Sequence, residues 1–284
     1  MITIQANAKI NLSLEVLGKR DDGFHRIASV MQEISLSDTV EFDEADEIEL
    51  ECSIPELNSS RNLVHVAAGV LRGFAGSSRG ASIRLNKRIP MAAGLGGGSS
   101  DAVSTLKALI DLWGLELSPE QLLDLAQRLG SDTAFFVHGG TALVEGRGEL
   151  VTPLSSLPAT WVVIAVPPIN VPQNKTKAMY AALRPPHFSD GRRTRELADS
   201  LAEHGDISFD SLPNAFESVA FEVYRRLDIY WQRLVDLGAD NVHLAGSGPA
   251  LFSLSRDRVS AKLLYDSTKS EGMESYLVQT VEQL

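Results

Sequence analysis

The sequence predicts a soluble α+β protein with two domains, residues 1–155 and 156–284. Runs that alternate apolar and polar residues, as strands do, are interleaved with segments whose apolar residues recur at helical spacing. The length suits one large domain or two of moderate size, and a new buried-looking strand beginning at Thr160 favours a change of domain just before it. Hydrophobic residues at 44% and charged residues at 22% are ordinary for a globular protein.

The first part of the chain is expected to be rich in strands. The segments ITIQANAKINLSLEVLG and ASVMQEISLSDTVEFDEADEIELEC both alternate. The acidic residues from Glu41 to Glu51 are interpreted as a solvated strand face and turn rather than a metal site, because no histidine accompanies them. A helix is expected at about residues 62–74, and the alternating segment GASIRLNKRIP then leads into a glycine-rich stretch.

Two amphipathic helices are expected after that stretch. The first has about three turns, and its apolar face is formed by Ala102, Leu106, Leu109 and Trp113. Its plausible capping residues are Ser99, Ser100 and Asp101. The second helix, SPEQLLDLAQRLG, is predicted to begin with Ser118 as its cap and to end at Gly130. The segment SDTAFFVHGGTALVEGRGE then supplies a turn, an apolar segment and a glycine-rich reversal.

The second part of the chain is expected to open with the buried strand TWVVIAVPP. The polar residues 184–211 are expected to form a mobile insertion with one short helix, and a long helix is expected at about residues 215–237. The segment NVHLAGSGPALFSLS predicts a strand, a tight glycine turn and a second strand, and the helix RVSAKLLYDSTK follows.

Charge and composition argue against several classes of function. A net charge of -11 repels a polyanion, so nucleic acid is not an expected partner, and an anionic small molecule needs a local positive or amide-lined site. No run of 18 apolar residues occurs, and the N-terminus lacks the features of a signal peptide, so a cytoplasmic protein without a membrane partner is expected. The sequence has a single cysteine, Cys52, which excludes an internal disulfide; Cys52 is interpreted as a small, apolar-tolerant residue in a strand.

The stretch RIPMAAGLGGGSSDA, residues 88–102, is the most unusual local feature of the sequence. A glycine-rich turn that enters a helix presents unpaired amides and the positive end of the helix dipole, so phosphate is its natural ligand. The stretch matches neither the P-loop, which requires a lysine after its last glycine, nor the dinucleotide fingerprint with its fixed glycine spacing. A flexible loop without a ligand is the alternative.

Three further features are ambiguous when each is taken alone. The turn Gly246-Ser247-Gly248 lies between apolar strands and is by itself a hairpin signal. Asp132 follows a helix end and precedes two phenylalanines, which suits a partly buried general base, although a capping aspartate is commoner. Lys9 lies in an alternating strand, where a lysine on its own usually points outward.

Taken together and in this order, these stretches resemble the GHMP kinase superfamily, named for galactokinase, homoserine kinase, mevalonate kinase and phosphomevalonate kinase. The segment PMAAGLGGGSSDA is similar to the family's ATP loop, and LAGSGPALF is similar to its late glycine motif. The segment AKINLSLEVLGKRDDGFHRIASVMQEISLSDTV most resembles the branch that acts on 4-diphosphocytidyl-2-C-methyl-D-erythritol, and GSDTAFFVHGGTALVEGRGE and LPNAFESVAF support this. The resemblance spans almost the whole chain. It implies a ribosomal protein S5 domain 2-like N-terminal domain and a ferredoxin-like α/β C-terminal domain.

The resemblance implies an ATP-dependent kinase, monomeric or homodimeric, with Mg²⁺. Its acceptor would be the 2-hydroxyl of this cytidine diphosphate-linked methylerythritol, in the non-mevalonate route to isoprenoid precursors. Lys9 and Asp132 are the implied catalytic pair, and Asn62 is placed near the adenine. The residues implied to wrap the triphosphate are Pro90, Met91, Ala92, Ala93, Gly94, Leu95, Gly96, Gly97, Gly98, Ser99 and Ser100, of which the two serines are candidate Mg²⁺ ligands. The implied substrate-binding residues are Asn11, Phe24, His25, Gly246 and Ser247.

Some positions depart from the family pattern or leave alternatives open. Phe24 stands where a tyrosine is expected, and stacking on a pyrimidine survives because only a hydroxyl is lost. Tyr180 is a candidate for a second contact to the cytosine, and the basic patch Asn174, Lys175 and Lys177 either touches the diphosphate or is mere surface. The alternatives are another kinase of the superfamily, acting on mevalonate, homoserine or a sugar without a cytosine clamp, and a non-catalytic nucleotide or metabolite sensor, which needs no base.

Overall fold

The computed structural model describes residues 1–282. The chain forms two compact units, each assembled from segments that are far apart in the sequence. Unit 1 comprises Met1–Ala8, Leu36–Ile89 and Gly96–His138, and unit 2 comprises Lys9–Ser35, Pro90–Leu95 and the chain from Gly139 onward. Neither unit is one continuous stretch, and the domain boundary between residues 155 and 156 stays a prediction.

The strands of unit 1 follow the alternating segments of the sequence. The strand β5 (Gly80–Asn86) pairs in parallel with β4 (Ile48–Cys52) and antiparallel with the second half of β3 (His25–Ala45). A further strand, β1 (Ile2–Asn11), also pairs with β3. The exposed face carries ion pairs from Arg84 to the acidic end of β3, which agrees with the solvated face expected there. Cys52 lies in a strand, as expected, and is buried at the end of β4.

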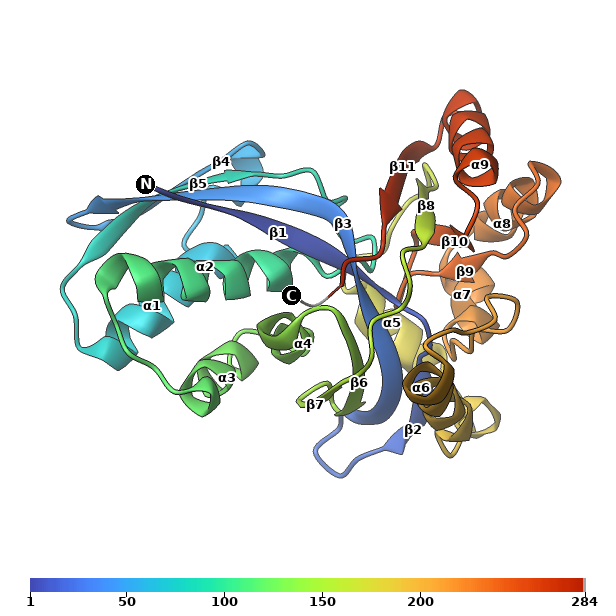
Figure 1. Ribbon diagram of the computed structural model, residues 1–284, viewed down its shortest axis with the longest axis horizontal. Coiled ribbons are helices and arrows are strands. Elements are labelled where there is room, and N and C mark those ends of the chain that lie inside the picture. Colours follow the sequence, from blue (N-terminus) through green and yellow to red (C-terminus); the bar gives the residue numbers. More distant parts are fainter. Residues whose placement is uncertain (283–284) are drawn as a thin grey trace. The chain divides into compact units, whose positions relative to one another are not determined.

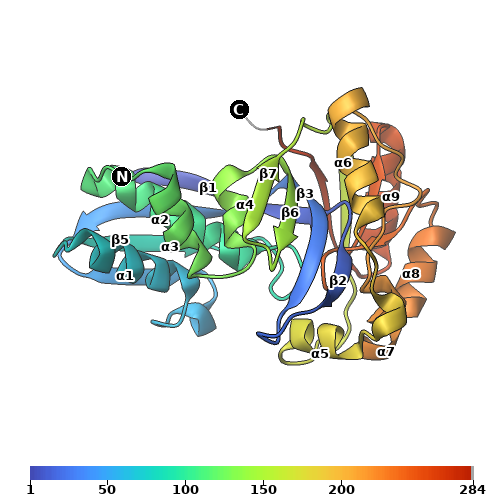
Figure 2. The ribbon, with the colours of Figure 1, turned by 90° about the horizontal axis from the view of Figure 1, so that it is seen from below.

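Helices cover one face of these strands (Figures 1 and 2). They are α1 (Leu63–Ala75), α2 (Gly97–Trp113), α3 (Pro119–Gln127) and α4 (Thr133–His138), with a short 3-10 turn at Pro55–Leu57. Ser118 caps α3 as predicted, in a reciprocal box with Gln121. The caps expected for α2 are wrong, because the helix already begins at Gly97 and its cap residue is Gly96. Ser99 and Ser100 therefore lie within its first turn, and Asp101 follows at the start of the second.

Unit 2 contains the first half of β3 and a separate antiparallel sheet. The first half of β3 pairs with β2 (Glu15–Lys19) and β6 (Thr141–Gly146), and β6 pairs with β7 (Leu150–Pro153). The separate sheet has the order β11-β8-β10-β9. Its strands are β8 (Trp161–Val166), β9 (His243–Leu244), β10 (Leu251–Ser255) and β11 (Glu274–Gln279).

The helices of unit 2 all come after β7 along the chain. They are α5 (Lys175–Ala182), α6 (Arg192–His204), α7 (Glu217–Val223), α8 (Leu227–Asp236) and α9 (Arg258–Ser270), with a short 3-10 turn at Pro185–His187. The helix α9 packs on β8 and β11 (Figure 1), and α5 packs on α7 (Figure 2). Among residues 1–282, no helix is long and apolar enough to cross a membrane.

The single long helix expected at residues 215–237 is wrong, because the chain breaks between α7 and α8. Tyr224 takes up an extended backbone conformation there, and Arg226 has a φ of 72°. The side chain of Tyr224 is fully buried, and its hydroxyl donates a hydrogen bond of 2.6 Å to the backbone oxygen of Ser247. The break thus places Tyr224 in contact with the late glycine turn. The segment contains neither glycine nor proline, so its sequence does not signal the break.

Candidate active site

The lysine of the first strand is buried, so the outward orientation expected for Lys9 alone is wrong. Lys9 is only 4% exposed, and its Nζ donates a hydrogen bond of 2.8 Å to Asn11 Oδ1. The amide of Asn11 in turn donates to Ser29 Oγ at 2.8 Å. The backbone amide of Lys9 donates to the oxygen of Leu95, in the glycine-rich loop, at 2.9 Å. Buried lysines are rare unless polar groups surround them, and this lysine is fixed in place by such groups.

The late glycine turn lies directly against Lys9 and the glycine-rich loop. A Cβ added at Gly246 would lie 3.1 Å from each of three atoms, Lys9 Nζ, Asn11 Oδ1 and Gly94 O. Gly94 has a φ of +92°, and a Cβ there would lie 1.9 Å from the backbone oxygen of Ala245. Any side chain is excluded by this close approach of two backbones. The structure therefore brings together four of the residues predicted from the sequence.

Polar side chains of the 214–224 segment form hydrogen bonds with the backbone at this turn. Asn214 Nδ2 donates hydrogen bonds of 3.0 Å to the backbone oxygens of Leu244 and Gly246. Glu217 Oε1 accepts a hydrogen bond of 2.9 Å from the amide of Leu244, and burial raises the pKa of Glu217 to about 7. Sequence reasoning assigned no role to Asn214, Glu217 or Tyr224, although LPNAFESVAF was one of the stretches that carried the family resemblance.

The glycine-rich loop is anchored by two buried apolar side chains and exposes the side chain of Met91. Ala93 and Leu95 are 2% and 1% exposed, whereas Met91 is 56% exposed. The loop enters α2 at Gly96, whose φ is 74°, and no side chain within residues 1–282 caps the helix. The amides of Ser99 and Ser100 both donate to the backbone oxygen of Gly96 at 3.0 Å, so the amides that suit an anionic ligand are those of Gly97 and Gly98.

Other predicted residues lie around this first turn of α2 in unit 1. A Cβ at Gly98 would lie 3.6 Å from Leu63 Cδ1, so the turn is next to Asn62, which caps α1 by accepting a 3.0 Å hydrogen bond from Val64 N. A Cβ at Gly130 would lie 3.6 Å from Ser99 Oγ. The glycine-rich turn is thus between the start of α1 and the start of the segment that contains Asp132.

Asp132 is half-buried and directly precedes α4. The turn that carries it is fixed by Thr133, whose hydroxyl donates to the backbone oxygens of Ala126 at 2.6 Å and Gly130 at 2.7 Å. These hydrogen bonds fix the backbone that carries the Asp132 carboxylate. This placement fits a base that has to meet a bound ligand.

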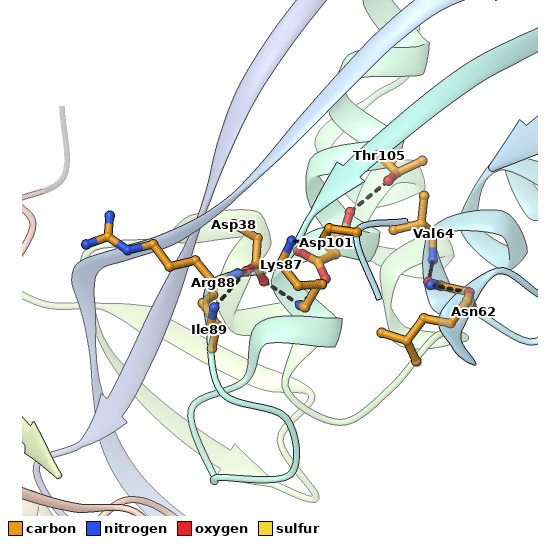
Figure 3. Close-up of polar contacts among 10 residues, drawn as sticks. Asp38, Asn62, Val64, Lys87, Arg88, Ile89, Asp101 and Thr105 are labelled. Carbon is orange, nitrogen blue, oxygen red and sulfur yellow. Dashed lines mark hydrogen bonds and ion pairs between the residues drawn. The ribbon is translucent and has the colours of Figure 1, made fainter. Parts of the chain in front are cut away.

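A buried cluster of one lysine and two aspartates lies within unit 1, between β3, the end of the β5 segment and the start of α2 (Figure 3). Lys87 Nζ contacts Asp101 Oδ2 at 2.6 Å and also contacts Asp38 Oδ2, and Asp38 Oδ1 accepts hydrogen bonds from the amides of Arg88 and Ile89. Burial raises the pKa of Asp101 to about 7, although the charge of Lys87 opposes the change. Within the described chain, Asp101 Oδ1 is buried without a hydrogen-bond partner. Sequence reasoning missed this cluster.

An aromatic cluster surrounds His25 in unit 2. Its ring stacks on that of Tyr180 with a centroid distance of 4.7 Å and an interplanar angle of 16°, and Phe188 lies at 6.1 Å. Burial and the charge of Lys19 lower the pKa of His25, which favours the neutral imidazole. Phe24 is 52% exposed, and the guanidinium of Arg147 lies 5.0 Å from its ring centre.

Comparison with known proteins shows to which family the chain belongs. The model of the GHMP kinases N terminal domain matches residues 62–140, and that of the GHMP kinases C terminal region matches residues 179–272. The chain belongs to the GHMP kinase family. One curated relative of this GHMP kinase, from Dehalococcoides mccartyi, is 40% identical over 100% of both chains and is named 4-diphosphocytidyl-2-C-methyl-D-erythritol kinase.

Solved structures of GHMP kinases share the fold over nearly the full length. The crystal structure of a 4-(cytidine 5'-diphospho)-2C-methyl-D-erythritol kinase matches with a TM-score of 0.83 and 31% identity, and covers 98% of this chain and 99% of that one. A homoserine kinase from Cytophaga hutchinsonii matches with a TM-score of 0.72 and 19% identity over 99% and 95% of the two chains, which shows the common fold alone. The predicted two-domain α+β GHMP kinase fold is therefore confirmed.

Proposed function

We propose that this GHMP kinase transfers the γ-phosphoryl group of ATP to the 2-hydroxyl of 4-diphosphocytidyl-2-C-methyl-D-erythritol, in the non-mevalonate route to isoprenoid precursors. The observation that carries the proposal is the full-length likeness to relatives that bear this name. The stacked pair His25 and Tyr180 supports it, because a pyrimidine ring requires an aromatic surface and hydrogen-bonding groups at its edge.

The nucleotide is proposed to bind at the glycine-rich loop, residues 90–100. The amides of Gly97 and Gly98 at the start of α2 would hold phosphate oxygens, and the missing side chains at Gly96, Gly97 and Gly98 let the backbone approach them closely. Asn62 lies next to this turn through its neighbour Leu63, which supports its role near the adenine. The anchoring of Ala93 and Leu95 in the core gives the loop a fixed shape before ATP arrives.

Phosphoryl transfer depends mainly on positioning and on stabilisation of charge. Asp132 is proposed to accept the proton of the attacking hydroxyl, and the hydrogen bonds of Thr133 fix the backbone turn that carries it. Lys9 is proposed to stabilise negative charge on the reacting oxygens. The hydrogen bond from Lys9 to Asn11 orients the ammonium group, and Asn11 itself is proposed to lie near the acceptor.

The donor set of unit 1 fits Mg²⁺ only as a partner of the bound phosphates. No group of three or more acidic, histidine or cysteine side chains among residues 1–282 is arranged to hold a metal. Hydroxyl oxygens at Ser99 and Ser100 are hard donors, and Mg²⁺ usually keeps few protein ligands beside substrate phosphates. When bound, Mg²⁺ would neutralise charge on the β- and γ-phosphates. Oligomeric state, monomer or homodimer, and a cytoplasmic location stay predictions.

The substitution Asp132→Asn tests the assigned base. Turnover is expected to fall by roughly 10²- to 10⁴-fold, the usual range for loss of a general base, while ATP binding is retained. Asp124→Asn, a matched change at an exposed position of α3, serves as the control and keeps wild-type turnover. Wild-type turnover in Asp132→Asn would mean that another group accepts the proton.

Acceptor choice is tested by one coupled assay with three acceptors side by side. The cytidine-diphosphate acceptor is expected to support turnover, whereas mevalonate and homoserine are not. The double variant Phe24→Ala and His25→Ala should lose affinity for the first acceptor, since both residues are proposed to contact the cytosine. Turnover on mevalonate or homoserine that survives the double substitution would favour another kinase of the family, and ATP binding without any turnover would favour a sensor.

A further inference from the structure

The short strand β9 lies at one edge of the separate sheet of unit 2, where side chains bind its backbone. The amide of Leu244 donates to Glu217 Oε1 at 2.9 Å, and the oxygen of Leu244 accepts a hydrogen bond of 3.0 Å from Asn214 Nδ2. Backbone groups at a sheet edge need partners just as those inside a sheet do. Asn214 and Glu217 therefore take the place of a neighbouring strand beside Leu244.

The half-buried Asn214 also reaches beyond β9 to the late glycine turn. Its Nδ2 donates a second hydrogen bond, of 3.0 Å, to the backbone oxygen of Gly246, and its Oδ1 accepts one of 3.0 Å from the amide of Phe216. A carboxamide has two donor hydrogens, and the oxygens of Leu244 and Gly246 use both. Three hydrogen bonds thus fix the plane of this amide, which holds the end of β9 and the turn in one arrangement.

The backbone around Asn214 is paired with the chain that follows β1. The amide of Leu14 donates to the oxygen of Pro213 at 2.6 Å, and the amide of Ala215 donates to the oxygen of Leu14 at 2.8 Å. These two bonds form a parallel bridge between Leu14 and Asn214. Lys9 lies on β1, shortly before Leu14 in the chain. Asn214 therefore connects the segment that carries Lys9 with the turn that lies against Lys9.

The contact between Lys9 and the turn is close and buried. A Cβ added at Gly246 would lie 3.1 Å from Lys9 Nζ and from Asn11 Oδ1, and Lys9 is 4% exposed. The turn is thus part of the wall around the ammonium group of Lys9. Misplacing a catalytic group by about 1 Å can cost roughly 100-fold in rate, even when the substitution lies away from the reacting atoms.

We infer that Asn214 is a positioning residue for phosphoryl transfer, which fixes the turn at Gly246 against Lys9 and so sets the place of its ammonium group. The inference rests on the charge-stabilising role proposed for Lys9. Asn214 acts through Lys9, whose effect is on charge that develops during the transfer. Its loss should therefore lower kcat and leave KM for ATP unchanged.

Steady-state kinetics of two substitutions at Asn214 measures this effect with ATP and the cytidine-diphosphate acceptor. Asn214→Ala is expected to lower kcat by roughly 10- to 100-fold without a change in KM for ATP. Asn214→Ser keeps an acceptor for the amide of Phe216 but is too short to bind both backbone oxygens. The serine variant is expected to show the same loss of kcat with a smaller loss of stability, so it serves if the alanine variant fails to fold.

Asn241 offers a matched control in the same sheet. Its Nδ2 donates to the oxygen of Leu254 at 2.9 Å, and its Oδ1 accepts from the amide of Leu254 at 2.8 Å. Asn241→Ala and Asn241→Ser thus also remove side-chain hydrogen bonds to the backbone of a strand, β10, but not those to the glycine turn. Urea midpoints are expected to fall for substitutions at both asparagines, whereas kcat is expected to fall only for those at Asn214.

A double-mutant cycle with Lys9→Met tests whether Asn214 acts through Lys9. Adding Asn214→Ser to Lys9→Met should lower kcat little further, because the group to be positioned is already gone. The inference is overturned if the Asn214 variants keep wild-type kcat, if the Asn241 variants lose as much, or if the two losses multiply in the double variant. Wild-type kcat in Lys9→Met would overturn the role proposed for Lys9 and the inference with it, whereas a loss there beside normal Asn214 variants would overturn the inference alone.

Discussion

Replacing Lys87 by methionine removes the only lysine or arginine side chain that the structure, over residues 1–282, places against both Asp38 and Asp101. Asp38 is 0% exposed, and the side chains of Lys87 and Asp101 are 6% and 4% exposed. Methionine has similar length and fills the space without charge. The variant would therefore leave two carboxylates in the interior of unit 1 without the ammonium group that compensates their charge.

The loss of stability follows from this burial. Breaking a buried ion pair by removing one partner typically destabilises a protein by about 3–5 kcal/mol, because the remaining charge is left uncompensated. Asp38 keeps its hydrogen bonds from the amides of Arg88 and Ile89, which moderates the effect. Asp101 Oδ1 already lacks a partner within the described chain, so Asp101 bears most of the penalty.

The effect is expected to depend on pH in a defined direction. Burial raises the pKa of Asp101 from 3.8 to about 7, so the folded protein binds more protons than the unfolded chain between these values. The stabilising contribution of this proton is present at low pH and is lost as the pH rises through about 7. Without Lys87 the pKa of Asp101 would rise further, and the variant should be least stable relative to wild type at pH 8.

Urea unfolding at pH 8 and at pH 6 measures the effect. The matched control is Arg84→Met, because Arg84 also contacts two carboxylates but on the exposed face of β5, where ion pairs contribute little. Asp101→Asn in the Lys87→Met background should recover part of the stability. Equal midpoints for Lys87→Met and the wild type at pH 8, or a larger loss at pH 6 than at pH 8, would refute the reasoning.

Three further predictions follow from single contacts. Glu217→Gln keeps an acceptor for the amide of Leu244 but removes a carboxyl whose pKa burial raises to about 7, so urea midpoints should show a smaller fall than the wild type between pH 5.5 and 8. Gly94→Ala should abolish turnover, measured by the coupled assay, because its Cβ would lie 1.9 Å from a backbone oxygen; normal turnover would disprove this contact. Tyr180→Ala should raise KM for the acceptor by roughly tenfold while Tyr180→Phe does not, since stacking requires only the ring.

Local signals in the sequence predicted much of the fold. The apolar periodicity of both helices and the cap at Ser118 are properties of neighbouring residues, so α1 and α3 begin where the pattern indicates. The break at Tyr224 has no such signal, because it depends on a tertiary hydrogen bond to Ser247. The short helix α4 and the last strand, β11, also lacked a periodic pattern long enough to predict them.

The candidate site, like the fold, was predicted from the sequence in part only. Glycine density and motif order pointed to the loop at residues 90–100 and to Lys9 and Asp132, whose catalytic roles stay predictions. The cluster around Lys87 was missed, although Asp38 occupies a position of β3 between the buried Leu36 and Val40. A carboxylate on the apolar side of a strand is a signal that a buried partner exists, but the sequence does not say which residue provides it.

The most direct test of the central claim is a phosphorus NMR spectrum of the cytidine-diphosphate acceptor after incubation with the enzyme, ATP and Mg²⁺. The account predicts one new phosphate monoester on the acceptor with the diphosphate unchanged. Because the 2-carbon carries a methyl group and no hydrogen, this phosphorus should show no coupling to a proton on the carbon that bears it. A monoester coupled to such a proton, a lengthened phosphate chain, or an unchanged acceptor beside consumed ATP would contradict the account.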